Sequence, residues 1–168
     1  ACSETMGHTG NGTTITNNQT GSISGTPWGF EIWFDGGNNS MTYYNNGTFK
    51  AQWSGSNDFL ARVGYRYGDN GPGIDHNDYH FTVDYKYTKQ SQSAGYGYIG
   101  VYGWTVNPQV EYYIVDDWYS KPNTQYIGDQ FGEITVDGAK YTIHAFLRQE
   151  EPSKTGTSTF LQIFSVRQ

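Results

Sequence analysis

Apolar and polar residues alternate along almost the whole chain, and this pattern limits the fold more than any other feature of the sequence. Side chains at positions i and i+2 share one face of a β-strand, so a period of two predicts strands with one buried and one exposed face. No window of useful length shows the 3.6-residue apolar period of a helix. The pattern predicts an all-β fold of many strands, a sandwich or jelly roll. The expected strands are residues 13–24, 28–34, 40–44, 48–53, 58–67, 79–87, 96–104, 111–117, 133–136, 139–148 and 157–166.

Turn-forming residues separate these expected strands. Two dipeptides, Asn46-Gly47 and Asp137-Gly138, are strong hairpin signals, because a type I′ turn requires positive φ at both central residues. The chain shows no internal repeat, no low-complexity linker and no domain boundary. Its 168 residues are therefore expected to form a single domain.

Composition argues against several classes of partner. The net charge of −6 argues against nucleic acid and against an anionic membrane surface. No apolar run approaches the roughly 20 residues that span a bilayer. Low charge with abundant Tyr, Asn and Thr is typical of a secreted protein that faces polysaccharide, and any signal peptide is expected to have been removed. Cys2, the only cysteine, is expected to be free or to pair with a residue outside this sequence.

One carboxylate lies among aromatic residues in the stretch YIGVYGWTVNPQVEYYIVD. The stretch reads as two strands joined by a tight turn at Asn107-Pro108. Tyr102 and Trp104 share a face of the first strand, and Glu111 and Tyr113 share a face of the second. Aromatic rings stack on sugar faces and a carboxylate can attack an anomeric carbon. The arrangement therefore predicts a cleft in which a glycosidic bond is broken.

The same stretch resembles, in VYGWTVNPQVEYYIVD, the signature of glycoside hydrolase family 11, the jelly-roll endo-1,4-β-xylanases. The resemblance extends to WGFEIWFDGG, FKAQWSGSNDFLARVGY, DGAKYTIHAFLR and EPSKTGTSTFLQIFSVRQ, which together span nearly the whole chain. It implies a β-jelly roll of two packed, strongly twisted antiparallel sheets that form an aromatic-lined cleft. It also implies a secreted, extracellular enzyme that hydrolyses internal β-1,4-xylosidic bonds of xylan with retention, by double displacement, and that needs no metal or cofactor.

The resemblance assigns roles to individual residues. Glu111 matches the catalytic nucleophile, which forms the covalent glycosyl-enzyme intermediate. The other matches are substrate-binding residues: Trp33 as a stacking platform, Tyr98 as a cleft tyrosine, Tyr102 and Tyr113 as tyrosines that hold the nucleophile and the distorted sugar beside it, Pro152 as the tip of a thumb that closes over the substrate, and Gln162 as a polar residue beneath the thumb. Glu31, two residues before Trp33, is expected to be a sugar-binding or structural acid.

Asp58 matches the position beside the family's general acid, where the acid-active members have Asp. Two hydrogen-bonded carboxyl groups titrate as a coupled pair. Asp58 is therefore expected to tune the pH dependence of the reaction and to give an acidic optimum. The alternative is an aspartate that is solvated at the end of a strand.

The resemblance breaks at several positions. A retaining glycosidase needs two carboxyl groups about 5–5.5 Å apart, and no glutamate here matches the family's acid/base Glu, which follows the SVRQ run. The domain is therefore expected to be truncated at its C-terminal end, to have its own missing C-terminal segment as a partner, and to hydrolyse little without it. Ala145 aligns where the family usually has an arginine that reaches the sugar, and Lys154 replaces the Ile of the thumb.

Other functions stay open on the sequence alone. A non-catalytic carbohydrate-binding jelly-roll module would keep the aromatic groove, and an inactive xylanase fragment would keep Glu111 without its acid/base partner. The expected ligands are xylan and xylo-oligosaccharides, and the chain is expected to be monomeric. A metal site is a third possibility, but we interpret its residues as a polar turn that leads into a strand; they are Asp75, His76, Asp78 and His80.

Overall fold

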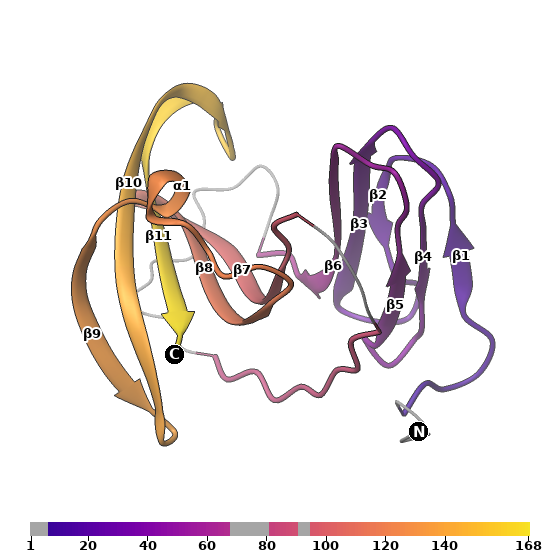
Figure 1. Cartoon of the computed structure of the whole chain (residues 1–168). Helices are drawn as coiled ribbons and strands as arrows, with labels where there is room; N and C mark the ends of the chain where they lie inside the picture. The colour runs from indigo at the N-terminus through magenta and orange to yellow at the C-terminus, as the bar shows by residue number, and fades with distance from the viewer. Residues whose placement is uncertain (1–6, 68–80, 91–94) are drawn as a thin grey trace. The chain divides into compact units, whose positions relative to one another are not determined.

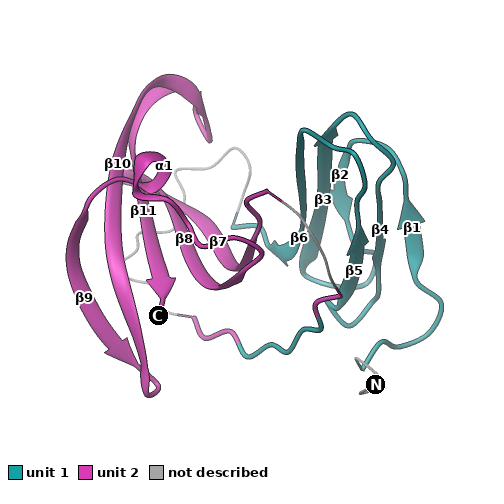
Figure 2. Ribbon diagram, viewed as in Figure 1, with its two compact units in different colours: residues 1–69, 84–88 teal, residues 70–83, 89–168 magenta. Residues whose placement is uncertain are grey.

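Figure 1 shows the computed structural model of the chain, which describes residues 7–67, 81–90 and 95–168. Within these ranges the chain forms eleven strands and one short helix, so the prediction of an all-β fold is confirmed. The chain divides into two compact units, residues 1–69 with 84–88 and residues 70–83 with 89–168 (Figure 2).

Unit 1 consists of two three-stranded sheets that pack face to face. One sheet has the order β1-β4-β5 and the other β2-β3-β6. Its core consists of Ile23, Phe30, Ile32 and Met41, each at most 3% exposed, and it takes side chains from β3 and β4 of the two sheets. Burying such a side chain stabilises the fold by roughly 1.5–3 kcal/mol. The strands are β1 (Thr13–Ile15), β2 (Gln19–Ser22), β3 (Trp28–Asp35), β4 (Ser40–Tyr43), β5 (Phe49–Gln52) and β6 (Asp58–Tyr65).

Unit 2 is a five-stranded sheet in the order β7-β8-β11-β10-β9. Its neighbouring strands are antiparallel except β8 and β11, which are parallel. The helix α1 (Thr124–Ile127) adds Ile127 to a core of Val115, Phe164 and Val166. The strands are β7 (Tyr98–Val106), β8 (Gln109–Trp118), β9 (Gln130–Val136), β10 (Ala139–Ser153) and β11 (Gly156–Arg167).

Two expected strands differ from the structure. The expected strand 13–24 is broken, because β1 pairs with β4 of one sheet whereas β2 pairs with β3 of the other. The expected strand 79–87 is wrong over its described residues, 81–87, which are all exposed and form no strand; residues 79 and 80 lie outside the described ranges. Alternation alone does not make a strand, because the backbone groups of a strand also need a partner strand.

The two predicted hairpin turns are both present, with different geometries. Asp137 and Gly138 have φ of 50° and 76°, as a type I′ turn requires. At the β4–β5 hairpin only Gly47 has positive φ, at 82°. Asn46 instead uses its side chain, whose Oδ1 accepts hydrogen bonds from the backbone N–H and the hydroxyl of Thr48.

Candidate active site

Three strands of unit 2 place the predicted nucleophile at the centre of a hydrogen-bonded cluster. The turn at Asn107-Pro108 leaves β7 and β8 in a tight hairpin, in which Trp104 lies directly opposite Glu111. On the other side of β8, Gln162 of β11 pairs with Glu111 in parallel register. Glu111 is therefore flanked on both sides within the sheet. It is only 7% exposed.

Both carboxylate oxygens of Glu111 accept hydrogen bonds. The Tyr102 hydroxyl donates to Oε2 at 3.0 Å. The side-chain amide of Gln162, which is 5% exposed, donates through Nε2 to Oε1. A buried carboxylate is costly unless such donors satisfy its oxygens, so these two bonds make the position of Glu111 possible.

Each of these two donors is itself bonded to a group that can only donate. The indole Nε1 of Trp104 donates to the Tyr102 hydroxyl at 2.6 Å. The guanidinium Nε of Arg148 donates to Oε1 of Gln162 at 3.1 Å. Because indole and guanidinium groups have no acceptor, every proton in the chain of bonds points toward Glu111. We call Trp104, Tyr102, Glu111, Gln162 and Arg148 the Glu111 network; its direction matches an ionised carboxylate, which only accepts.

Aromatic rings surround this network, as the sequence predicted. Tyr102 meets Tyr113 edge to face, with ring centroids 4.9 Å apart, and Tyr113 stacks on Phe164 at 4.5 Å. Trp104 packs on Phe160 at 4.9 Å. Tyr98 lies further along the same face, with its ring nearly perpendicular to that of Phe164. These rings pack around the side chains next to Glu111, which limits the rotamers that those side chains can adopt.

Burial also affects the ionisation of Tyr98. Partial removal from water disfavours its phenolate and raises the pKa of the hydroxyl, and the neighbouring Tyr96 raises it further. Tyr98 therefore stays a neutral hydrogen-bond donor across the ordinary pH range. In this form the Tyr98 hydroxyl can donate a hydrogen bond to a sugar hydroxyl or ring oxygen.

Unit 1 contains two of the predicted site residues. Trp33 on β3 is 42% exposed, on the face opposite the core residues Phe30 and Ile32. Asp58 is exposed at the start of β6, where its Oδ1 accepts from the backbone N–H of Phe59 at 2.8 Å. An exposed tryptophan on a sheet face fits a stacking platform, and the exposure of Asp58 is compatible with both of its expected roles.

Two further side chains have roles that the structure clarifies. Glu31 pairs with Arg62 directly across the strands, with its Oε2 2.7 Å from Nη2 and 2.9 Å from Nε, so it is a structural acid. The structure also shows which arginine approaches Glu111. Ala145 pairs with Ile163, whose side chain lies on the opposite face of β11 from that of Gln162. The arginine that bonds to Gln162 is Arg148, three residues later. No local pattern in the sequence marked Arg148, because a bulge between Arg148 and Glu151 interrupts the alternation along β10.

Pro152 lies near the end of β10, in the hairpin that β10 forms with β11. It pairs with Thr157, and the strands are joined by the two-residue turn Lys154-Thr155. A bulge between Arg148 and Glu151 separates this part of the hairpin from the part beside Glu111. We call residues 151–158 the hairpin tip.

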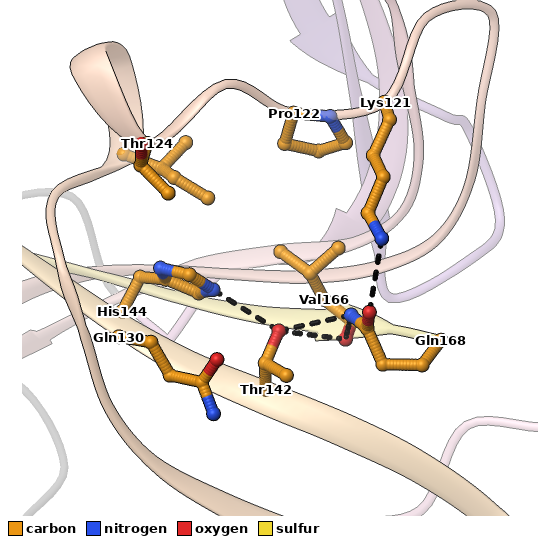
Figure 3. Close-up of a pocket in the computed structure, with 9 residues that line it drawn as sticks. Lys121, Pro122, Thr124, Gln130, Thr142, His144, Val166 and Gln168 are labelled. Carbon is orange, nitrogen blue, oxygen red and sulfur yellow. Dashed lines mark hydrogen bonds between the residues drawn. The ribbon is translucent and has the colours of Figure 1, made fainter.

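A pocket of about 180 Å³ lies elsewhere in unit 2, around His144 (Figure 3). His144 is 5% exposed, and both ring nitrogens are bonded, Nδ1 with the carbonyl of Gly128 and Nε2 with the hydroxyl of Thr142. Gln168 donates to the same hydroxyl and accepts from Lys121. The polar groups of this pocket satisfy one another, which is typical of a buried structural histidine.

The described residues give no indication of a metal centre or of a membrane span. No group of three or more His, Cys, Asp or Glu side chains that could hold a metal ion occurs among them. The acidic and His cluster of Asp75, His76, Asp78 and His80 lies outside the described residues. No helix in the described part of the chain is long and apolar enough to cross a membrane.

Comparison with known proteins agrees with this geometry. The family model described as "Glycosyl hydrolases family 11" matches residues 27–168, which include residues of both units. The chain is 51% identical to endo-1,4-beta-xylanase C of Fibrobacter succinogenes and 44% identical to endo-1,4-beta-xylanase S20 of Neocallimastix patriciarum, with 99% of the chain covered in each case. It spans 28% and 50% of the length of these two relatives.

Solved structures extend the likeness to the fold. The crystal structure of wild-type ENZbleach xylanase is 34% identical and matches with a TM-score of 0.77, covering 96% of this chain and 69% of that one. A mutant of the same xylanase is 32% identical and matches with a TM-score of 0.80, covering 96% of this chain and 68% of that one. The jelly-roll prediction is thereby confirmed, although one strand pair, β8 with β11, is parallel. The chain belongs to the family 11 glycosyl hydrolases.

Proposed function

We propose that the protein containing this chain is a retaining endo-1,4-β-xylanase with Glu111 as its nucleophile. The observation that carries the proposal is the Glu111 network, in which two oriented donors hold a nearly buried carboxylate in its acceptor form among aromatic rings. The relatives named as endo-1,4-beta-xylanases support xylan as the substrate. Xylo-oligosaccharides would be shorter ligands of the same site.

In the first step, a carboxylate oxygen of Glu111 forms a bond with the anomeric carbon of a xylose unit. The bond from that carbon to the leaving oxygen breaks, and the electron pair departs with that oxygen, which takes a proton from a general acid. Water then attacks the anomeric carbon of the glycosyl-enzyme ester and loses a proton to the conjugate base of the general acid. The bond to Glu111 breaks, and the sugar is released with its original configuration. Tyr102 and Gln162 hold different oxygens of the carboxylate, so Glu111 keeps one anchored oxygen while the other reacts.

The remaining residues would bind and position the sugar. Tyr98, Tyr102 and Tyr113 offer rings and hydroxyls on the Glu111 face of the sheet, and Trp33 offers an exposed ring for stacking. We further propose that the protein is secreted and acts as a monomer, which suits an insoluble polymer outside the cell. Its low charge and abundant polar β-sheet residues support this localisation.

A mechanism-based inhibitor tests the nucleophile separately from the general acid. A 2-deoxy-2-fluoro-β-xylobioside with a dinitrophenolate leaving group needs no protonation on departure, so it requires the nucleophile alone. We expect one equivalent of dinitrophenolate to be released, with the mass of the fluoro-xylobiosyl group added to a peptide that contains Glu111.

The variant Glu111→Gln should bind xylo-oligosaccharides but acquire no label. Labelling at another carboxylate would contradict the assignment of Glu111. Binding of xylohexaose without any label in the unmodified protein would favour a non-catalytic carbohydrate-binding module. An inactive xylanase fragment would take the label yet fail to hydrolyse xylan, because natural leaving groups need the acid.

A further inference from the structure

The hairpin tip extends beyond the sheet that supports the rest of β11. Pairing between β11 and β8 covers Leu161 to Val166, opposite Val110 to Val115. Residues 156–160 of β11 pair with β10 alone. Within the described residues, the tip therefore has no ladder of backbone hydrogen bonds to the strand that bears Glu111, and its position must be set by side chains.

Gln109 supplies such side-chain bonds. It is the first residue of β8, and by alternation its side chain lies on the same face as Glu111, two residues later. This separation corresponds to about 7 Å along the strand. Gln109 is thus the side chain of β8 that is best placed to join the hairpin tip to the Glu111 face.

The amide of Gln109 bonds to three hydroxyl groups of the tip. Its Nε2 donates to Ser158 Oγ at 2.8 Å and to Ser153 Oγ at 3.2 Å. Its Oε1 accepts from Thr155 Oγ1 at 2.7 Å. Two donated bonds and one accepted bond use both amide hydrogens and the carbonyl oxygen, and they reach both strands of the tip and its turn.

The tip is also organised internally around one of these hydroxyls. Ser153 Oγ donates to the carbonyl of Gly156 at 2.5 Å and accepts from the backbone N–H of Thr155 at 3.2 Å. The hydroxyls of Ser153 and Ser158 are 2.8 Å apart. Because Gln109 binds this preformed cluster, it holds the tip as one body.

We infer that Gln109 is a positioning residue that fixes the hairpin tip, and with it Pro152, beside the face of the sheet that carries Glu111. Breaking its bonds would let the tip swing about the bulge between Arg148 and Glu151, where Glu150 has a φ of 53°. The consequence for catalysis rests on the proposed function: a loosened tip would bind the sugar chain less tightly, so KM for xylohexaose would rise several-fold with a smaller change in kcat.

Amide hydrogen exchange in the whole protein tests the inference without any assay of activity. Gln109→Met keeps the size of the side chain and removes its hydrogen bonds. Losing one or two net hydrogen bonds should speed exchange of residues 151–158 by about 5- to 30-fold and leave the rest of β10 and β11 unchanged. Thr155→Val should give part of the same effect, and Thr155→Ser should restore slow exchange.

The matched control is Thr157→Val, which removes a tip hydroxyl for which the structure shows no bond to Gln109. Equal exchange at the tip in Gln109→Met and Thr157→Val would overturn the inference. So would additive effects in the double variant Gln109→Met/Thr155→Val, because two ends of one bond cannot be lost twice. If Gln109→Met fails to fold, Thr155→Val tests the same bond, because Thr155 is exposed. Faster amide exchange at the hairpin tip in a protein that shows no turnover would support the role of Gln109 and contradict the proposed function.

Discussion

Replacing Gln162 by methionine should lower both the stability and the turnover of the protein. Methionine keeps the volume of glutamine, so the change leaves no cavity, but it removes the bonds to Glu111 and Arg148. A hydrogen bond to a charged group contributes roughly 1.5–3 kcal/mol. Arg148 is half-buried and can turn to water, whereas Glu111 is 7% exposed and keeps an unpaired Oε1. The free energy of unfolding should therefore fall by about 3 kcal/mol.

Thermal unfolding measures this loss. For a chain of this size, 3 kcal/mol corresponds to a decrease in Tm of roughly 6–12 °C. Turnover should fall by up to about 100-fold, because one oxygen of Glu111, the proposed nucleophile, is no longer held in place. Gln125→Met is the matched control, since Gln125 is exposed on α1.

The double variant Arg148→Met/Gln162→Met should be less destabilised than the sum of the single variants, because the two residues share a bond. A Tm for Gln162→Met within about 1 °C of that for Gln125→Met would refute the reasoning, since it would mean that the network contributes no net stability.

Three further predictions concern ionisable groups. Tyr102→Phe removes the hydroxyl that links Trp104 to Glu111 and should lower kcat by about 10- to 100-fold. Tyr112→Phe, on the other face of β8, should leave kcat unchanged, and steady-state kinetics of the two variants test the difference. Asp58→Asn should move the optimum of the pH–rate profile toward neutral, and an unmoved optimum would contradict the coupling to a general acid. Burial raises the pKa of the Tyr98 and Tyr112 hydroxyls above 10.0, so above about pH 10 the folded protein keeps protons that the unfolded chain releases. These two groups therefore leave stability unchanged below about pH 10 and lower it as the pH rises further. In Tyr112→Phe the decrease in Tm at alkaline pH should be smaller.

Features that depend only on residues close together in the sequence could be predicted from it. The positive φ of Asp137 and Gly138 follows from their residue types, and the shared face of Glu111 and Tyr113 follows from alternation. The same local rules do not say which strands become neighbours. The pattern in residues 81–87 is as regular as that of β8, yet these residues form no strand in the described structure.

The contacts that complete the site are long-range, and local patterns could not reveal them. Gln162 and Glu111 are 51 positions apart and meet only because β11 runs parallel to β8. The sequence suggested Gln162 through family resemblance alone. Arg148 was missed, because its relation to the site depends on the register of β10 with β11 and on a bond to Gln162. Gln109 gave no signal, since a glutamine at the start of a strand has no special meaning without knowledge of the hairpin tip.

The parallel pairing of β8 with β11 also determines when Glu111, the proposed nucleophile, reaches its final geometry during folding. The Tyr102–Glu111 bond closes a loop of 9 positions and can form with the β7–β8 hairpin, whereas the Gln162–Glu111 bond closes one of 51. The longer closure costs roughly 1.5 kcal/mol more in chain entropy, before any contact compensates for it. Glu111 therefore remains anchored by one oxygen until the β10–β11 hairpin docks. In a refolding experiment, reactivity of the nucleophile should appear with that docking step and not with the earlier formation of β-structure.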